Sequence, residues 1–395
     1  MPLNRREFLG SAAALSAAVR LRGAGKKKGP RPSVLLISVE GLGAWMLGIY
    51  GNKSIKTPQL DIQGRSGIRL MNACTAAPAP EPGRASMLAG VAPMQLAAAH
   101  ATMADTLRQN GYQATIADAP AGSLDACTHA ALDFLKGQKA DRPFFHVVDY
   151  APLRAEKIPD RCLAGYRDSN FSGLGWLPAA PDAASGRDIL RDPVDALRKA
   201  AAGIAWLDEQ IPLLRGALVN QKLYDSTITV ITGTSGQLLG HHGLWGDGRA
   251  SHPPNMYEEV VRVPFLCSWP GQTPADVFRM EAVSLYDLAA TIYDMAGITA
   301  PAVTSPGKSF ARVLLNESFP KKQPWRNLVF AEIEGTCMAR DNRYKLVLQP
   351  DGSGKLFDIE ADPAENTDHF DDGSYIAVKT RLTNALNGWR NTFHS

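Results

Sequence analysis

The stretch Ser33-Val-Leu-Leu-Ile-Ser-Val39 is a run of mostly apolar and β-branched residues. Apolar residues at successive positions, rather than alternate ones, predict a strand that is buried on both faces. Comparable runs follow at residues 112–117, 143–149, 227–232 and 263–267, and helical patterns cover 101–109, 190–220 and 284–296. Strands alternating with helices predict an α/β fold with a mostly parallel sheet sandwiched by helices. Functional side chains are then expected beyond the carboxyl ends of the strands.

The last quarter of the chain has a different pattern. Short strand-like runs at 327–331, 344–348 and 355–358 are joined by turn-rich links, and Pro350-Asp-Gly-Ser-Gly354 is typical of a hairpin turn. A final helical pattern covers about residues 375–389. We therefore predict three parts: a signal and linker at 1–30, an α/β domain at 31–320, and a small subdomain with an antiparallel sheet and a helix at 321–395.

The charge of the chain is concentrated at its N-terminus. The 395 residues carry a formal net charge of +3, but residues 1–28 hold seven Lys/Arg and one Glu, so that removing their +6 leaves −3 for the remainder. Because the body is not basic, nucleic acid is not an expected partner.

The N-terminal segment has the pattern of an export signal. Asn4-Arg-Arg-Glu-Phe-Leu-Gly10 is typical of a twin-arginine signal, and the small apolar stretch at 11–19 follows it. That stretch is too short to cross a bilayer. We expect a periplasmic or secreted protein without a transmembrane segment in its mature form.

The cysteines do not predict a metal site. They are odd in number, widely spaced and free of the CxxC pattern, so no zinc site is expected and at most two disulfides could form. The five are Cys74, Cys127, Cys162, Cys267 and Cys337.

Several blocks follow one another in an order that indicates a family. They are Arg31-Pro-Ser-Val-Leu-Leu-Ile-Ser-Val-Glu-Gly-Leu-Gly43, residues 47–61, residues 72–78 running into 84–90, Gly240-His-His-Gly-Leu-Trp-Gly246, residues 257–264, Tyr344-Lys-Leu346 and residues 356–366. Together they resemble the formylglycine-dependent (type I) sulfatases of the alkaline phosphatase superfamily. The resemblance implies that family's fold, cleavage of sulfate esters by a hydrated formylglycine, and a calcium-type ion that neutralises the sulfate.

The position of the attacking residue departs from the family pattern. That pattern is Cys/Ser-x-Pro-x-Arg, which Pro82 and Arg84 fit, but the nucleophile position is Pro80. Proline has no thiol or hydroxyl to oxidise or to attack with. Cys74 lies six residues too early and is interpreted as a packed thiol. A short helical pattern follows Gly83 and Arg84, and Arg84 is either an anion anchor or a structural fork that bonds loop carbonyls.

The implied metal site also departs from the family. The four matching positions are Glu40, Gly41, Thr234 and Ser235, of which only Glu40 could ligate a hard cation. We therefore expect no cofactor; the alternative is a divalent cation, calcium, if the site is functional.

Two further family positions have changed, and some polar residues remain. A histidine that assists the leaving group in the family is replaced by Leu153, and the family's lysine after Gly-Leu-Trp-Gly is replaced by Asp247. Arg84, His242 and Asp247 are the residual candidates at the catalytic site, and Arg84 and Arg249 the candidates for binding an anion.

The segment at 240–252 allows a different metal hypothesis. His241, His242, Asp247 and His252 are ligand types that suit a transition metal. Only His242 fits the family block, which favours a packing or loop role for it. For the neighbouring pair at 258–259 we favour a structural role.

Three functions remain open. The first is an exported, non-catalytic sulfatase-like protein that binds an anionic small molecule or sulfated glycan, or a protein partner. The second is a divergent sulfate- or phosphate-ester hydrolase that uses rearranged groups such as Glu40, Asp247 and the histidines. The third is a structural subunit that pairs with an active relative. Enzymatic activity is therefore not assigned from the sequence.

Overall fold

The computed structural model of the chain describes residues 31–117, 123–154, 157–171 and 192–393. The described residues from 32 onward form one compact unit. The predicted signal and linker at 1–30 lie outside the described residues. The predicted division near residue 320 falls between helix α11 (Ala311–Leu314) and strand β10 (Val329–Ile333) and stays a prediction.

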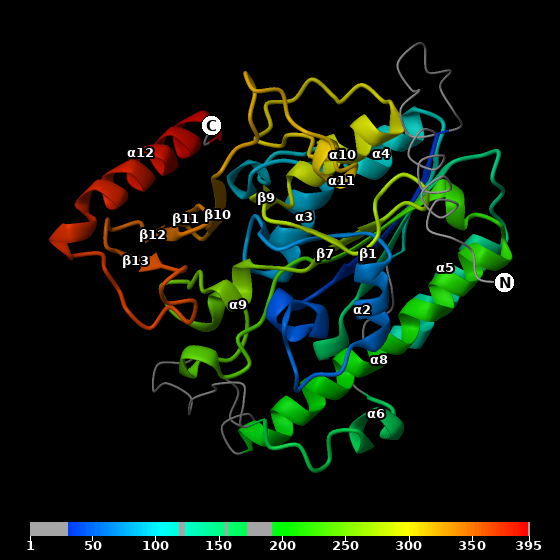
Figure 1. The fold of residues 1–395 in the computed structure, drawn as a ribbon, viewed down its shortest axis with the longest axis horizontal. Coiled ribbons are helices and arrows are strands. Elements are labelled where there is room, and N and C mark those ends of the chain that lie inside the picture. Colours follow the sequence, from blue (N-terminus) through cyan, green and yellow to red (C-terminus); the bar gives the residue numbers. More distant parts are fainter. Residues whose placement is uncertain (1–30, 118–122, 155–156, 172–191, 394–395) are drawn as a thin grey trace, which may run out of the picture. The chain divides into compact units, whose positions relative to one another are not determined.

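A seven-stranded sheet forms the centre of the molecule, in the order β4-β5-β1-β6-β7-β2-β8 (Figure 1). Neighbouring strands among the first four are parallel, β7 is antiparallel to β6 and to β2, and β8 is parallel to β2. The predicted mostly parallel sheet is thus confirmed. The strands are β1 (Ser33–Val39), β2 (Ile68–Leu70), β4 (Gln113–Ala117), β5 (Phe144–Tyr150), β6 (Thr227–Gly233), β7 (Phe265–Ser268) and β8 (Val277–Arg279).

Helices cover both faces of this sheet, which explains the apolar run of β1. Leu35 and Ile37 pack in the core on the side of the long helix α8, whereas Val34 and Leu36 pack in the core on the opposite side. The first face is covered by α2 (Pro58–Arg65), α5 (Leu124–Lys136), α6 (Asp160–Ala164) and α8 (Pro193–Asn220). The second is covered by α3 (Pro80–Ala89), α4 (Met103–Gln109), α10 (Asp287–Ala296) and α11.

A second sheet, made by the C-terminal residues, stands beside the central one (Figure 1). It is an antiparallel meander of β10, β11 (Thr336–Arg340), β12 (Tyr344–Leu348) and β13 (Gly354–Asp358). Helix α12 (Ile376–Phe393) covers the face that presents Leu346 and Leu356. The predicted small antiparallel sheet with a helix is therefore confirmed, and β11 is an additional strand.

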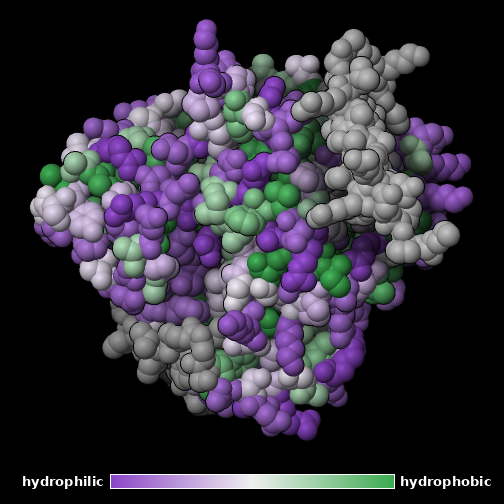
Figure 2. All heavy atoms as spheres, viewed as in Figure 1, coloured by the Kyte–Doolittle hydropathy of each residue, from purple (hydrophilic) through white to green (hydrophobic). Residues whose placement is uncertain are grey.

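Three short elements complete the description. Strands β3 (Ala73–Cys74) and β9 (Val283–Ser284) form a small parallel pair, and α9 (Glu258–Val261) is a single helical turn. On the face that Figure 2 presents, most residues are hydrophilic, with smaller apolar groups between them. None of the helices in the described segments is both long enough and apolar enough to cross a membrane.

Candidate functional site

The ends of three parallel strands bring the predicted site residues to one edge of the central sheet. Ser38 of β1 is aligned with Asp149 of β5 and with Thr232 of β6, so Glu40 and Thr234 lie just beyond neighbouring strand ends. Helix α3 reaches the same edge, because a Cβ on Gly83 would lie 2.3 Å from the main-chain oxygen of Thr234. The structure therefore places the positions implied by the resemblance next to one another.

Helix α3 begins earlier than the sequence predicted. We expected the helix to follow Arg84, but it begins at Pro80, and its first turn closes with the Gly83 N–H donating to the Ala79 carbonyl at 3.0 Å. The first-turn N–H groups of a helix have no intrahelical partner, so Pro80 and Pro82 lose nothing there. Arg84 is consequently inside the helix, and Pro80 is its buried first residue.

Arg84 is held by a carboxylate that the sequence analysis did not single out. Its Nε donates to Asp149 Oδ2 at 2.9 Å, and its Nη2 contacts the same oxygen. The Ser38 hydroxyl donates to the other oxygen, Oδ1. Asp149 stands at the carboxyl end of a parallel strand, which is the signal that could have identified it. The Arg84 guanidinium is thus already paired with an anion of the protein itself, the Asp149 carboxylate.

The four positions that correspond to the metal site do not supply the ligands that calcium prefers. Glu40 contributes the single carboxylate, and Gly41 contributes no side chain and has φ of +71°. A Cβ on Gly41 would lie 2.9 Å from Gln237 Cγ and 3.1 Å from Leu153 Cδ1.

Hydroxyls stand at the other two positions that the resemblance implies. Thr234 and Ser235 are 2% and 0% exposed, and their side-chain oxygens have no hydrogen-bond partner among the described residues. Calcium takes six to eight oxygen ligands with several negative charges. One carboxylate and two enclosed hydroxyls do not fit that requirement, so we derive no chemical step through a calcium ion.

Arg249, the other residue predicted to bind an anion, also pairs with carboxylates. Its Nη2 lies 3.0 Å from Asp247 Oδ2 and 3.6 Å from Glu81 Oε2, and Glu81 belongs to the first turn of α3. Asp247 Oδ1 accepts from the Arg249 backbone N–H at 2.9 Å. These pairs connect the 240–252 segment to the helix that carries Pro80.

The three histidines of the 240–252 segment have separate surroundings. His241 bonds the Leu238 carbonyl through Nδ1 at 2.7 Å, and its ring meets Trp45 edge-on. His242 stacks on Tyr257, and His252 is exposed.

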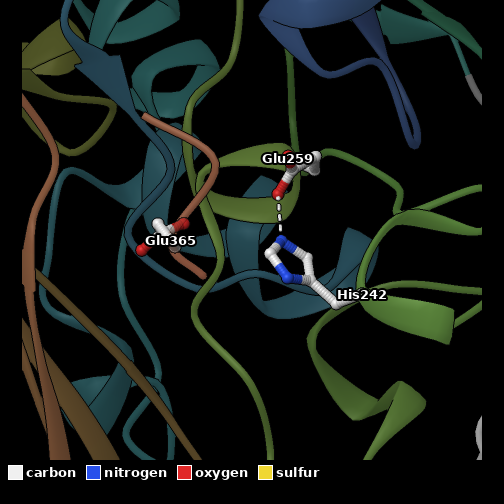
Figure 3. A group of neighbouring side chains, drawn as sticks. All are labelled: His242, Glu259 and Glu365. Atoms are coloured by element: carbon white, nitrogen blue, oxygen red, sulfur yellow. Dashed lines mark hydrogen bonds and ion pairs between the residues drawn. The ribbon is translucent and has the colours of Figure 1, made fainter. Parts of the chain in front are cut away.

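The ligand-type atoms that do gather around His242 come from other elements. Within the described residues, His242, Glu259 and Glu365 have ligand atoms within 4.8 Å of one another (Figure 3). Nε2 of His242 lies 3.2 Å from Glu259 Oε2. His241, Asp247 and His252 are outside this group.

A buried ion cluster next to this group joins the C-terminal sheet to helix α9. Glu258 accepts from Arg340 Nε and Nη2 at 2.9 Å each and lies 3.2 Å from Lys345 Nζ. Lys345 also contacts Glu365 and donates to the Met256 carbonyl at 2.7 Å. Burial alone would raise the pKa of Glu258, but Arg340 and Lys345 hold it well below its ordinary value. Burial raises the pKa of Glu365, which Lys345 opposes. The geometry agrees with a structural role for Glu258.

Comparisons with known proteins support one family. A family model described as Sulfatase matches residues 32–119 and 115–298, and one described as N-sulphoglucosamine sulphohydrolase, C-terminal, matches residues 240–392. Choline-sulfatase of Rhizobium meliloti is 28% identical over 183 residues, which are 46% of this chain and 34% of that protein. Delta 4,5-hexuronate-2-O-sulfatase of Bacteroides thetaiotaomicron is 24% identical over 91% of this chain and 88% of its own length.

A solved structure extends the likeness to the whole fold. It is the structure of a protein in complex with its substrate D-glucosamine-2-N,6-O-disulfate. That protein aligns with this chain with a TM-score of 0.78 and 20% identity, over 92% of this chain and 98% of its own. Since the Sulfatase model alone covers more than half of the sequence, this chain belongs to the sulfatase family.

Proposed function

We propose that this protein is an exported member of the sulfatase family that does not cleave sulfate esters by the formylglycine route and instead binds an anionic saccharide. The observation that carries the proposal is Pro80, the buried first residue of α3 at the nucleophile position. A pyrrolidine ring offers neither a thiol nor a hydroxyl, so no attacking atom can be formed there.

The surroundings of Pro80 support the same conclusion. Asp149 forms an ion pair with the Arg84 guanidinium, and the charge of that guanidinium would otherwise be available to a sulfate. Glu40 is the single carboxylate at the four metal positions. A sulfatase reaction needs an attacking atom and a means of neutralising the ester's charge, and this edge of the sheet provides for neither.

The ligand class follows from the relatives. Proteins similar to this chain are described as acting on a 2-O-sulfated hexuronate or as binding D-glucosamine-2-N,6-O-disulfate. We therefore propose a sulfated or otherwise anionic sugar as the ligand. Catalytic residues can be lost while binding surfaces are kept, because the two depend on different side chains.

Turnover and binding are measured together to test the function. The purified protein is incubated with a panel of sulfate and phosphate esters, alongside Arg84→Ala and Glu40→Gln. We expect release of sulfate and phosphate to equal the rate without protein. Turnover that is lost in both variants would establish a divergent hydrolase instead. In the same samples, a sulfated sugar that binds only the folded state should raise Tm with its concentration.

Export is tested separately. A reporter fused after residue 30 should reach the periplasm through the twin-arginine pathway, and replacing Arg5 and Arg6 by lysine should retain it in the cytoplasm. Retention of the unchanged fusion would contradict the proposed location.

A further inference from the structure

A cavity beside the C-terminal sheet has the chemistry that the proposed ligand requires. It has a volume of about 290 Å³ and lies between the segment Ser251–Tyr257 and the neighbouring strands β12 and β13. That volume is near the lower end of the range for small-molecule sites, which suits one or two sugar rings. Glu40, Arg84, Asp149 and Thr234 are not among the residues that line it.

The strand pattern of the C-terminal sheet explains why polar side chains line this cavity. Side chains alternate across a strand, so Val347 and Gln349 lie on the face opposite Leu346. Val347 is paired with Lys355 on β13, and Phe357 lies two residues further along. The face away from α12 therefore presents an amide, an ammonium and an aromatic ring to the 251–257 segment.

Lys355 is the one lysine or arginine among the described residues that line the cavity. His242, His252 and Lys355 line it, and no aspartate or glutamate is among the lining residues in the described part of the chain. The Lys355 ammonium donates to the Tyr257 hydroxyl at 3.0 Å and has no carboxylate partner among the described residues. In a body whose formal net charge is about −3, an uncompensated cation on a cavity wall favours an anionic ligand.

The remaining walls suit a sugar ring. Tyr257 is stacked on His242, with 3.6 Å between the ring centroids, and lies beside Phe357. Aromatic side chains provide an apolar surface for the C–H face of a sugar. The amide oxygens of Asn255 and Gln349 have no hydrogen-bond partner among the described residues. Hydroxyl groups, from a sugar or from ordered water, would satisfy them.

We propose that this cavity is the saccharide site, with the sugar ring beside Tyr257 and Phe357 and its anionic substituent at Lys355. The inference rests on the proposed function and gives it a location that includes His242 but none of Glu40, Arg84 and Thr234. Recognition is thereby separated from the strand ends where a sulfatase would perform its chemistry.

Isothermal titration of the full chain tests this location with three probes. They are D-glucosamine-2-N,6-O-disulfate, a 4,5-unsaturated hexuronate disaccharide with a 2-O-sulfate, and inorganic sulfate. We expect at least one saccharide to bind and to bind more tightly than sulfate, because sulfate alone does not contact the aromatic walls. Lys355→Met should weaken that Kd about tenfold or more, the value of one hydrogen bond to a charged group. Gln349→Ala should weaken it by a smaller factor.

The matched control is Lys322→Met, which removes the same charge from an exposed position outside the cavity. It should bind like the unchanged protein, and all three variants should keep its Tm. If Lys355→Met and Gln349→Ala bind the saccharide normally, the cavity is the wrong site although the function stands. If neither saccharide binds, both proposals fail. Ester turnover would refute only the non-catalytic function. In that case Lys355→Met should raise the KM of the turnover if the cavity is the saccharide site.

Discussion

The substitution Glu258→Gln tests whether the buried ion cluster holds the C-terminal sheet against helix α9. Glutamine keeps the shape of the side chain and removes its charge. The guanidinium of Arg340 and the ammonium of Lys345, which are 3% and 0% exposed, then face a neutral amide instead of a carboxylate. Water cannot compensate them, because the cluster is enclosed between β11, β12 and α9.

The size of the effect follows from the contacts. Removing one partner of a buried ion pair costs about 3–5 kcal/mol. Lys345 keeps its contact with Glu365, and the glutamine oxygen still accepts one hydrogen bond, so we take the lower end, about 3 kcal/mol. With an unfolding entropy of about 2.1 cal/mol/K for each of the roughly 360 residues in the compact unit, Tm should fall by about 4 °C.

Calorimetry of the unchanged protein and three variants measures this. Glu317→Gln is the matched control, since Glu317 is half exposed, lies 3.7 Å from Arg312 and should lower Tm by less than about 1 °C. Adding Arg340→Met to Glu258→Gln should restore part of the loss, because it removes the guanidinium left without a carboxylate. A Tm for Glu258→Gln equal to that of the control would refute the reasoning.

Three further outcomes are expected. Burial lowers the pKa of His146 to about 4, so the unfolded chain binds an extra proton below about pH 6.5. The free energy of unfolding, measured with guanidinium, should therefore fall by about 2 kcal/mol from pH 7 to pH 5 through this residue, and His146→Gln should lack that component. Pro80→Cys, checked by mass spectrometry for conversion to formylglycine, should still release no sulfate from an aryl sulfate, and turnover would contradict our account of the metal positions. Burial raises the pKa of all five thiols to about 11 or 12, so a thiol reagent should label none in the native protein and five after denaturation: Cys74, Cys127, Cys162, Cys267 and Cys337.

The fold was predictable because its signals are local. The apolar run of β1 indicates burial on both faces, and the structure buries all seven of its residues between two helical layers. The hairpin at 350–354 was likewise predictable from turn residues, since the Gln349 N–H donates to the Ser353 carbonyl at 2.8 Å. Strand β11 was missed. Its residues Thr336–Arg340 combine a polar end with a short apolar centre, and only pairing with β10 and β12 makes them a strand.

The site was predictable only in part, because its contacts join distant segments. The resemblance identified Arg84 and the four metal positions, and the strand register brings their neighbours together. The partner of Arg84 is 65 residues away, and no local pattern connects the two. The start of α3 was misjudged because prolines usually end helices, whereas Pro80 and Pro82 occupy the first turn, where they are tolerated.

The left-handed backbone at Gly41 restricts which residues can stand there. An aspartate there would adopt a positive φ and crowd Gln237 and Leu153, so the substitution should lower stability. Thr234 and Ser235 are enclosed as well, so a carboxylate at either position would be buried. Under the proposed function, an aspartate at residue 41 could become a metal ligand only if Gln237 and Leu153 moved with it, so a change there would have to be coupled to changes at those two neighbours.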